Sequence, residues 1–148
     1  MYGAIENFKK DGHLTHAAIM LDDAGTYRVG LLDYNNQAEK DIVCQELQKA
    51  VDEFKCVLLV QISEAWMNTP DESKEKEVFD AAARGELSKQ AGTVEVIQVI
   101  VESKYIKDGG FTAIARIRRE GSSSDIEEWK RYPLPTEGRF SRFLTTLH

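Results

Sequence analysis

The stretch KCVLLVQISEAWMN, residues 55–68, places an almost unbroken apolar run directly before a polar and aromatic segment. Residues 57–62 are apolar except for Gln61, which is typical of a central strand covered on both faces. If strict alternation continues beyond residue 62, Glu64 and Trp66 lie on one face of that strand. We therefore expect this strand at the centre of a sheet, and the placement of Glu64 decides whether it also carries a site.

A hairpin and a long helix precede this strand. Two apolar-rich runs in residues 16–34 flank the turn at residues 23–26, in which Gly25 occupies the position that needs a positive φ. Asn36 followed by Glu39 is a capping-box pattern. The apolar residues behind it recur on one helical face: Val43, Leu47, Ala50, Val51 and Phe54. We predict a helix over residues 37–54, and a right-handed crossover that lays the opening strand parallel to a hairpin strand.

Further elements follow the opening stretch. Residues 69–72 have the pattern of a helix start, and the polar helix 73–84 is predicted to turn Val78, Phe79 and Ala82 inward. Strands are predicted over residues 93–105, 111–120 and 126–132, with the last two paired.

Amphipathic segments are predicted at both ends of the chain, over residues 2–10 and 139–147. The apolar stripe of the second is formed by Phe140, Phe143, Leu144 and Leu147. Hairpins interrupted by one crossover helix predict an α+β fold: a single mixed, mainly antiparallel sheet of about five to six strands, one main amphipathic helix packed on it, and short peripheral helices. We expect one domain over residues 1–148.

Composition indicates an ordinary globular protein of the cytoplasm. The 148 residues are 42% hydrophobic and 30% charged. No apolar run approaches the roughly 20 residues that span a bilayer, so no membrane contact is expected. The start of the chain lacks the apolar region of a secretory signal. Cys44 and Cys56 are too few for a disulfide framework and are expected to be reduced.

Glu64 is the main candidate for a catalytic residue. A carboxylate that follows apolar residues on a strand face can have a raised pKa and act as a general acid or base, with His13 or His16 nearby. Trp66 can then stack on a ligand. Two structural alternatives stand beside this one: the strand ends near residue 62 and Glu64 faces solvent, or Glu64 is half-buried and paired with an arginine such as Arg116.

Other catalytic and metal-binding patterns are absent from the sequence. His13 and His16 stand near Asp22 and Asp23 without helical spacing, and the two cysteines fit no ligand pattern. There is no Gly-x-Ser-x-Gly, Walker loop or dinucleotide fingerprint. We predict no metal and no cofactor, and favour a protein that is not an enzyme.

The net charge of −6 disfavours general nucleic-acid binding, but it is unevenly distributed. Residues 104–148 carry nine Lys or Arg against six Asp or Glu, whereas residues 1–103 carry ten against nineteen. Candidate binding residues in the basic part are Arg116, Arg118, Trp129 and Lys130. Such a mixture can stack bases and hold phosphates, or it can be a solvated strand face.

Residues 11–103 carry a further pattern. Asp11-Gly12 precedes the hairpin and helix, Ser63-Glu64-Ala65-Trp66-Met67 closes the opening strand, and a later apolar strand begins Glu95-Val96-Ile97. This arrangement resembles a loosely defined group of small uncharacterised bacterial and phage proteins with a Ser-Glu-Ala-Trp motif at a strand end. The resemblance implies an α+β fold and no established activity, and it draws attention to Ser63, Glu64 and Trp66.

Three functions remain open. The first is a non-enzymatic domain that acts through a protein or other macromolecular interface, as a homodimer or with a protein partner, through the helix at 139–147. The second is a small hydrolase-like enzyme with Glu64 as general acid or base. The third is nucleic-acid binding by the basic hairpin at 111–132.

Overall fold

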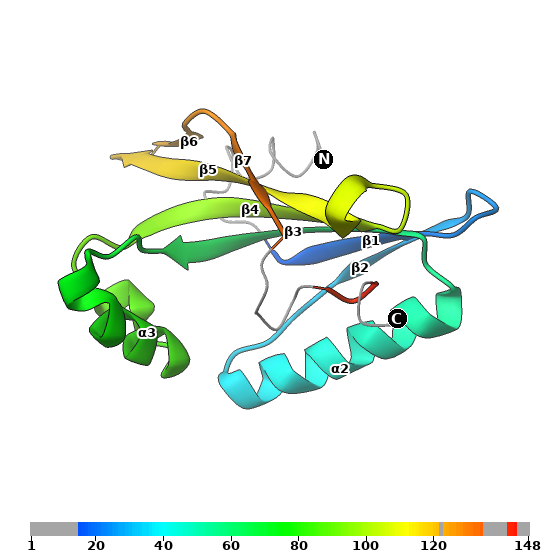
Figure 1. The fold of residues 1–148 in the computed structure, drawn as a ribbon, viewed down its shortest axis with the longest axis horizontal. Helices are drawn as coiled ribbons and strands as arrows, with labels where there is room; N and C mark the ends of the chain where they lie inside the picture. The colour runs from blue at the N-terminus through cyan, green and yellow to red at the C-terminus, as the bar shows by residue number, and fades with distance from the viewer. Residues whose placement is uncertain (1–14, 122, 135–141, 145–148) are drawn as a thin grey trace.

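One curved antiparallel sheet organises the chain (Figure 1). The computed structural model describes residues 15–121, 123–134 and 142–144. Its α-helices and strands are β1 (Ala17–Leu21), β2 (Tyr27–Leu31), α2 (Gln37–Phe54), β3 (Leu58–Met67), α3 (Glu75–Ala83), β4 (Val94–Ser103), β5 (Gly110–Glu120), β6 (Ser123–Ile126) and β7 (Lys130–Pro133). Short 3-10 helices lie at Glu72–Lys74, Leu87–Lys89 and Lys107–Gly109. The strand order is β2-β1-β3-β4-β5-β6, and β7 also pairs with β5.

The predicted α+β fold is confirmed, with a correction to the sheet. Each pair of neighbouring strands among the described residues is antiparallel, so the sheet is not mixed. β3 runs in the same direction as β2, but β1 lies between them and pairs with both. The crossover through α2 therefore skips one strand. Hydrophobic patterning predicts the strands but not which of them become neighbours.

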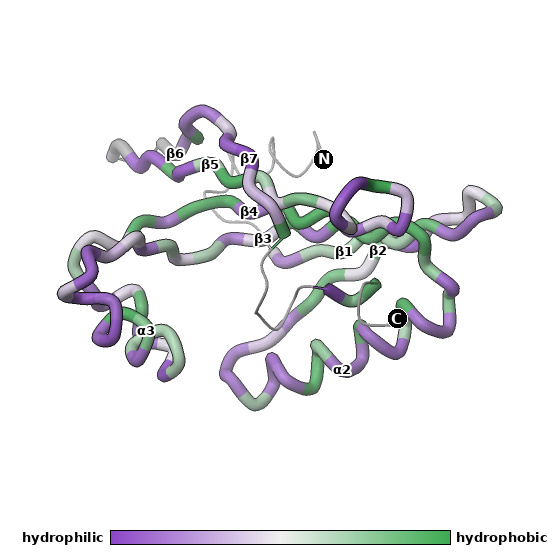
Figure 2. Tube along the Cα trace, in the orientation of Figure 1, coloured by the Kyte–Doolittle hydropathy of each residue, from purple (hydrophilic) through white to green (hydrophobic). Residues whose placement is uncertain are grey.

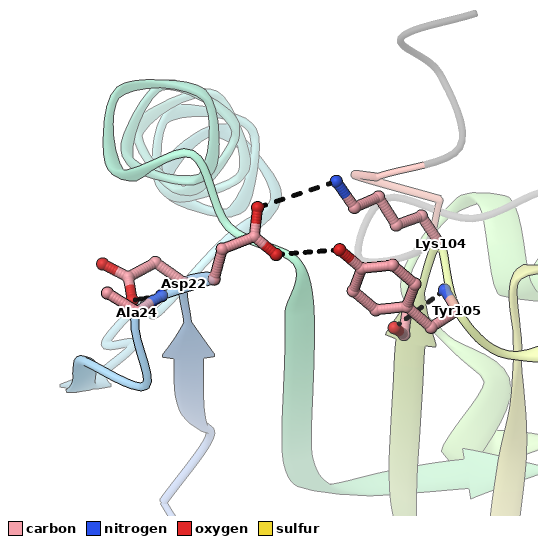
Figure 3. Close-up of polar contacts among 6 residues, drawn as sticks. Asp22, Ala24, Lys104 and Tyr105 are labelled. Carbon is pink, nitrogen blue, oxygen red and sulfur yellow. Dashed lines mark hydrogen bonds and ion pairs between the residues drawn. The ribbon is translucent and has the colours of Figure 1, made fainter.

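The first hairpin forms as its sequence predicts. Gly25 has a φ of 83°, a conformation that side chains disfavour, and its N–H donates to the carbonyl of Asp22 at 3.2 Å. The Asp22 carboxylate accepts from the N–H groups of Ala24 and Thr26, each at 2.9 Å. Figure 3 shows the tip of the hairpin bound to the end of β4, where Asp23 lies 2.8 Å from the Tyr105 hydroxyl.

The predicted cap of α2 forms at Asn36, although the Glu39 side chain accepts from the residue before the cap and not from the cap itself. The Asn36 side chain accepts a hydrogen bond from the N–H of Glu39 at 2.8 Å. The Glu39 carboxylate reaches back to the N–H of Asn35 at 2.5 Å. α2 covers residues 37–54, as predicted, and ends at Lys55 in the left-handed conformation.

The sheet has a buried cluster on each face. We call the face covered by α2 face A and the opposite face, face B. The face-A cluster joins β1 and β3 to α2 and contains Ala18, Met20, Leu47, Val51, Cys56, Leu59, Phe143 and Leu144. The face-B cluster contains Ile62, Ile97, Val99 and Ile117. Figure 2 shows hydrophobic residues along the central strands and alternating hydrophobic and hydrophilic residues along α2.

β3 extends to Met67 and does not end near residue 62. It pairs with β4 along its whole length, from Leu58 opposite Ser103 to Met67 opposite Val94. Its other neighbour, β1, begins at Ala17 opposite Ile62. The last five residues of β3 therefore have a paired strand on one side only, within the part of the chain that the structure describes.

Two peripheral predictions need correction. In α3, Val78 and Ala81 are buried, whereas Phe79 and Ala82 are exposed, so the predicted inward face was right only for Val78. The predicted strand 126–132 is replaced by two short strands, β6 and β7, which pair with different parts of β5.

The predicted terminal helices fall largely outside the described residues, which exclude 1–14, 135–141 and 145–148. Residues 142–144 are described and form a turn rather than a helix. Phe143 and Leu144 are buried in the face-A cluster. These two members of the predicted apolar stripe therefore cover the chain's own core.

Candidate functional site

Glu64 keeps the alternation of β3. It lies on face B with Ile62 and Trp66, half-buried and opposite Ile97 of β4. Arg116 lies opposite Val96 on face A, so the predicted pairing between Glu64 and Arg116 is not supported by the register. The structural alternative in which the strand ends before Glu64 is wrong, because the ladder runs through it.

His16 and Glu64 belong to opposite faces of the sheet. His16 lies against Gln61 on face A, whereas Glu64 lies on face B. Both residues border a depression of about 260 Å³ at the open edge of β3, beyond the start of β1. His13 is outside the described residues. The two residues therefore approach one depression from opposite faces of the sheet, and both of them, with Trp66, also border a larger cleft of about 510 Å³.

His16 is instead the centre of a buried polar contact. Its Nε2 lies 3.1 Å from Oε1 of Gln61, and its Nδ1 lies 2.8 Å from the hydroxyl of Tyr34. With the amide oxygen as acceptor, Nε2 carries the proton and Nδ1 accepts from Tyr34. Both ring nitrogens are thus engaged by side chains of the same chain.

Burial favours the uncharged forms of His16 and Tyr34. It lowers the pKa of His16 below 6.5, and the nearby Lys40 ammonium acts in the same direction, while the hydrogen bond that His16 donates to Gln61 opposes them. Burial also raises the pKa of Tyr34. A neutral imidazole with both nitrogens occupied joins three segments of the fold, and it can accept a proton or a metal only after a neighbour is displaced.

A cleft of about 510 Å³ opens beside His16 on face A. Its floor includes Ser63 and Gln98 from β3 and β4, and its walls come from the start of α2 and the end of α3. Figure 1 shows these two helix ends facing each other below the sheet. The Gln37 amide closes part of the gap, since a Cβ on Gly85 would meet its nitrogen at 2.7 Å.

The basic residues of the 111–132 region lie among carboxylates. Arg118 has its guanidinium 4.0 Å from Asp125, and Arg119 has its Nε 2.6 Å from Glu95. Arg116 and Lys130 line a depression of about 340 Å³ together with Glu127 and Glu128. Trp129 is exposed nearby in sequence, between these acidic and basic residues. The positive charge that the sequence predicts here is therefore locally offset.

The most exposed apolar surface that the structure describes in the sheet lies on β2. Tyr27, Val29 and Leu31 are 67%, 61% and 71% exposed, and the register places all three on face B. Sequence analysis predicted the strand but not this exposure. An alternating pattern shows which residues share a face, and gives no sign of whether anything covers that face.

Leu31 belongs to a series of facing residues on neighbouring strands, and their exposure changes step by step across face B. Leu31 lies opposite Ala17, Ala17 opposite Ile62, and Ile62 opposite Val99. Val99 and Ile62 are buried, Ala17 is half-buried and Leu31 is exposed. The apolar layer of face B therefore continues from the buried centre of the sheet to an open edge.

Glu102 is a buried carboxylate that sequence analysis missed. It lies on face A and is fully buried, with Oε2 accepting from the N–H of Phe143 at 3.1 Å. Burial raises its pKa, against the opposing effects of the 142–144 backbone N–H groups and the Arg142 charge. A signal was present, since alternation from Ile100 places Glu102 on the same buried face.

A scan against protein-family models and searches of the curated proteins and of the solved structures find no match for this chain. The resemblance based on the Ser-Glu-Ala-Trp motif therefore stays a prediction. Among the described residues, no helix has the length and apolar character needed to cross a bilayer.

Proposed function

We propose that this chain is a non-enzymatic cytoplasmic domain that acts through protein–protein interaction, and that its docking surface is the outer edge of β2. The exposure of Tyr27, Val29 and Leu31 on one face of an edge strand carries this proposal. Exposed contiguous apolar surface in a folded domain marks sites of association. The two free thiols, Cys44 and Cys56, fit a reducing compartment.

The two edges of the sheet differ in a way that supports this choice. The far edge is made of two four-residue strands, and β7 carries Lys130, Arg131 and Pro133, the kinds of residue that discourage edge pairing. β2 has the sequence YRVGL, with no lysine, proline or acidic residue. Its only charge, on Arg28, lies over the Phe54 ring at 5.0 Å. Within the part of the chain that the structure describes, one edge of the sheet is protected and the other is left open.

The two other functions have less support. Catalysis by Glu64 with His16 has less support because Gln61 and Tyr34 already engage both ring nitrogens of His16, although Glu64 and His16 border the same cleft. Nucleic-acid binding by Arg116 and Arg118 is weakened by the carboxylates that surround them. A labelled single-stranded oligonucleotide tests the second of these: strong, salt-sensitive affinity that is lost in Arg116→Ala and Arg118→Ala would favour nucleic-acid binding.

Affinity capture with matched variants tests the proposed surface. Val29→Lys places a charge on the outer edge of β2, and Phe79→Lys makes the same change at an exposed apolar position of α3. We expect the wild type and Phe79→Lys to capture the same binding partner, and Val29→Lys to lose that partner. Equal retention by all three, measured by quantitative mass spectrometry, would show that the β2 edge is not the docking surface.

A further inference from the structure

Among the described residues, only β1 pairs with β2, and the register of that pairing can be read from the two ends of the strand. The N–H of Leu32 donates to the carbonyl of His16 at 2.7 Å, and the N–H of Asp22 donates to the carbonyl of Thr26 at 3.0 Å. Hydrogen-bonded pairs alternate along an antiparallel ladder, so Arg28 and Gly30 also bond to β1. The N–H and C=O groups of the alternate residues, Tyr27, Val29 and Leu31, therefore point away from the sheet.

We infer that the occupant of this edge is a second copy of the chain, whose β2 pairs antiparallel with the first about a two-fold axis at Val29. This inference rests on the proposed function, because it names the partner for the same surface. In this register Val29 faces the partner's Val29, and Tyr27 faces the partner's Leu31. Each of these pairs uses groups that point outward, which gives about six new backbone hydrogen bonds.

Side-chain chemistry selects this register over its neighbours. Centring on Val29 places Arg28 opposite the partner's Gly30, so that no like charges meet across the pair. A shift of two residues in one direction sets Arg28 against the partner's Arg28. The opposite shift sets Tyr27 against the partner's Asp33, a charged residue beyond the end of β2. A shift of one residue pairs outward-pointing groups with groups that already bond to β1.

The pairing also explains the apolar character of β2. All three outward-pointing residues have their side chains on face B, so the two strands bring six apolar side chains together. Aromatic and β-branched residues such as Tyr27 and Val29 are well suited to packing across paired strands. The two seven-stranded sheets become one continuous sheet, and the apolar rows of face B continue across the two-fold axis.

Sedimentation of the full chain from about 1 to 200 µM tests the inference, since a small interface forms a concentration-dependent dimer. We expect the wild type to approach twice the mass of one chain. Val29→Pro removes an outward N–H that β1 does not use, so it is expected to fold and remain monomeric, as judged by circular dichroism and mass. Val29→Thr keeps this N–H and is expected to dimerise.

Cysteine cross-linking tests the register independently. Facing residues of a hydrogen-bonded pair lie about 5.5 Å apart at Cα, within the range that a disulfide can bridge. Val29→Cys alone is expected to cross-link above the background of the parent protein. Tyr27→Cys and Leu31→Cys are expected to cross-link when mixed, and far less when each is alone.

The outcomes separate this inference from the proposed function. A wild type that stays monomeric at the highest concentration, or a dimer that persists in Val29→Pro, overturns the second copy as occupant. If Val29→Lys nevertheless loses a different captured protein, the edge of β2 is still the docking surface and its partner is another chain. If neither dimer nor captured protein depends on Val29, both proposals fail.

Discussion

The backbone N–H of Phe143 donates a hydrogen bond to the buried carboxylate of Glu102, with 3.1 Å between nitrogen and oxygen. On its other side, the carbonyl of Phe143 accepts from the Gln48 side chain at 3.0 Å. Side chains from β4 and α2 thus hold the same peptide segment against face A. This contact explains why an acidic residue is tolerated in a buried strand.

Glu102→Ala is expected to destabilise the fold. It leaves the buried N–H of Phe143 without its acceptor, which lowers the free energy of unfolding by about 1–3 kcal/mol. Glu102→Gln keeps an oxygen at this position and is the matched control. Urea unfolding followed by tryptophan fluorescence measures both. Equal losses in the two variants would mean that the hydrogen bond to Phe143 contributes nothing.

The raised pKa of Glu102 predicts a dependence of stability on pH. The folded state binds the Glu102 proton more tightly than the unfolded chain does. The contribution of this proton to the free energy of unfolding is therefore full below the unfolded pKa of about 4.5, and it is lost as pH rises through the folded pKa. Glu102→Gln does not titrate. Its unfolding free energy relative to the wild type should therefore rise between about pH 4 and pH 8. A difference that is constant over this range would contradict the raised pKa.

His16 predicts the opposite trend. Burial lowers the pKa of His16. The contribution of the neutral imidazole to the free energy of unfolding is therefore full above the unfolded value of 6.5, and it is lost as pH falls through the folded pKa. The wild type should lose stability relative to His16→Gln on acidification below that value. Nuclear magnetic resonance titration of the imidazole checks the cause directly. A midpoint at or above 6.5 would show that burial does not lower the pKa of this group.

Gly110 and Gly30 form a matched pair for substitution by alanine. A Cβ on Gly110, which has a φ of 141°, would lie 1.9 Å from the carbonyl oxygen of Val101. Gly110→Ala should lower the free energy of unfolding by about 1–3 kcal/mol or more, because the strand ladder must move. A Cβ on Gly30 meets nothing within 4 Å, so Gly30→Ala should change stability by less than about 0.5 kcal/mol. Equal effects in thermal unfolding would argue against the placement of β5.

The elements with local signals could be predicted from the sequence. The hairpin turn depends on Gly25, and the start of α2 depends on Asn36 and Glu39, so neighbouring residues determine both. The end of β3 had no such signal. Ser63 and Glu64 break the apolar run, yet the strand continues because β4 supplies a ladder on one side. Strand pairing at that point depends on residues about thirty positions away.

The candidate site was harder to predict for the same reason. Glu64 keeps the alternation with Trp66 that a continuing strand predicts, but the pattern could not place His16 on the other face. It also could not show that Val29 is exposed while Val99 is buried, although both belong to apolar strands. Exposure is a property of how elements assemble, and no local pattern encodes it.

Amide hydrogen exchange along β2 tests directly whether the outer edge of this strand binds a second copy. In a single chain the N–H groups of Arg28 and Gly30 bond to β1, whereas those of Val29 and Leu31 point outward. We predict that protection of Val29 and Leu31 rises with protein concentration in the wild type and stays low throughout in a chain carrying Tyr27→Pro and Leu31→Lys. Rapid exchange of Val29 at every concentration, with Gly30 protected, would contradict the claim.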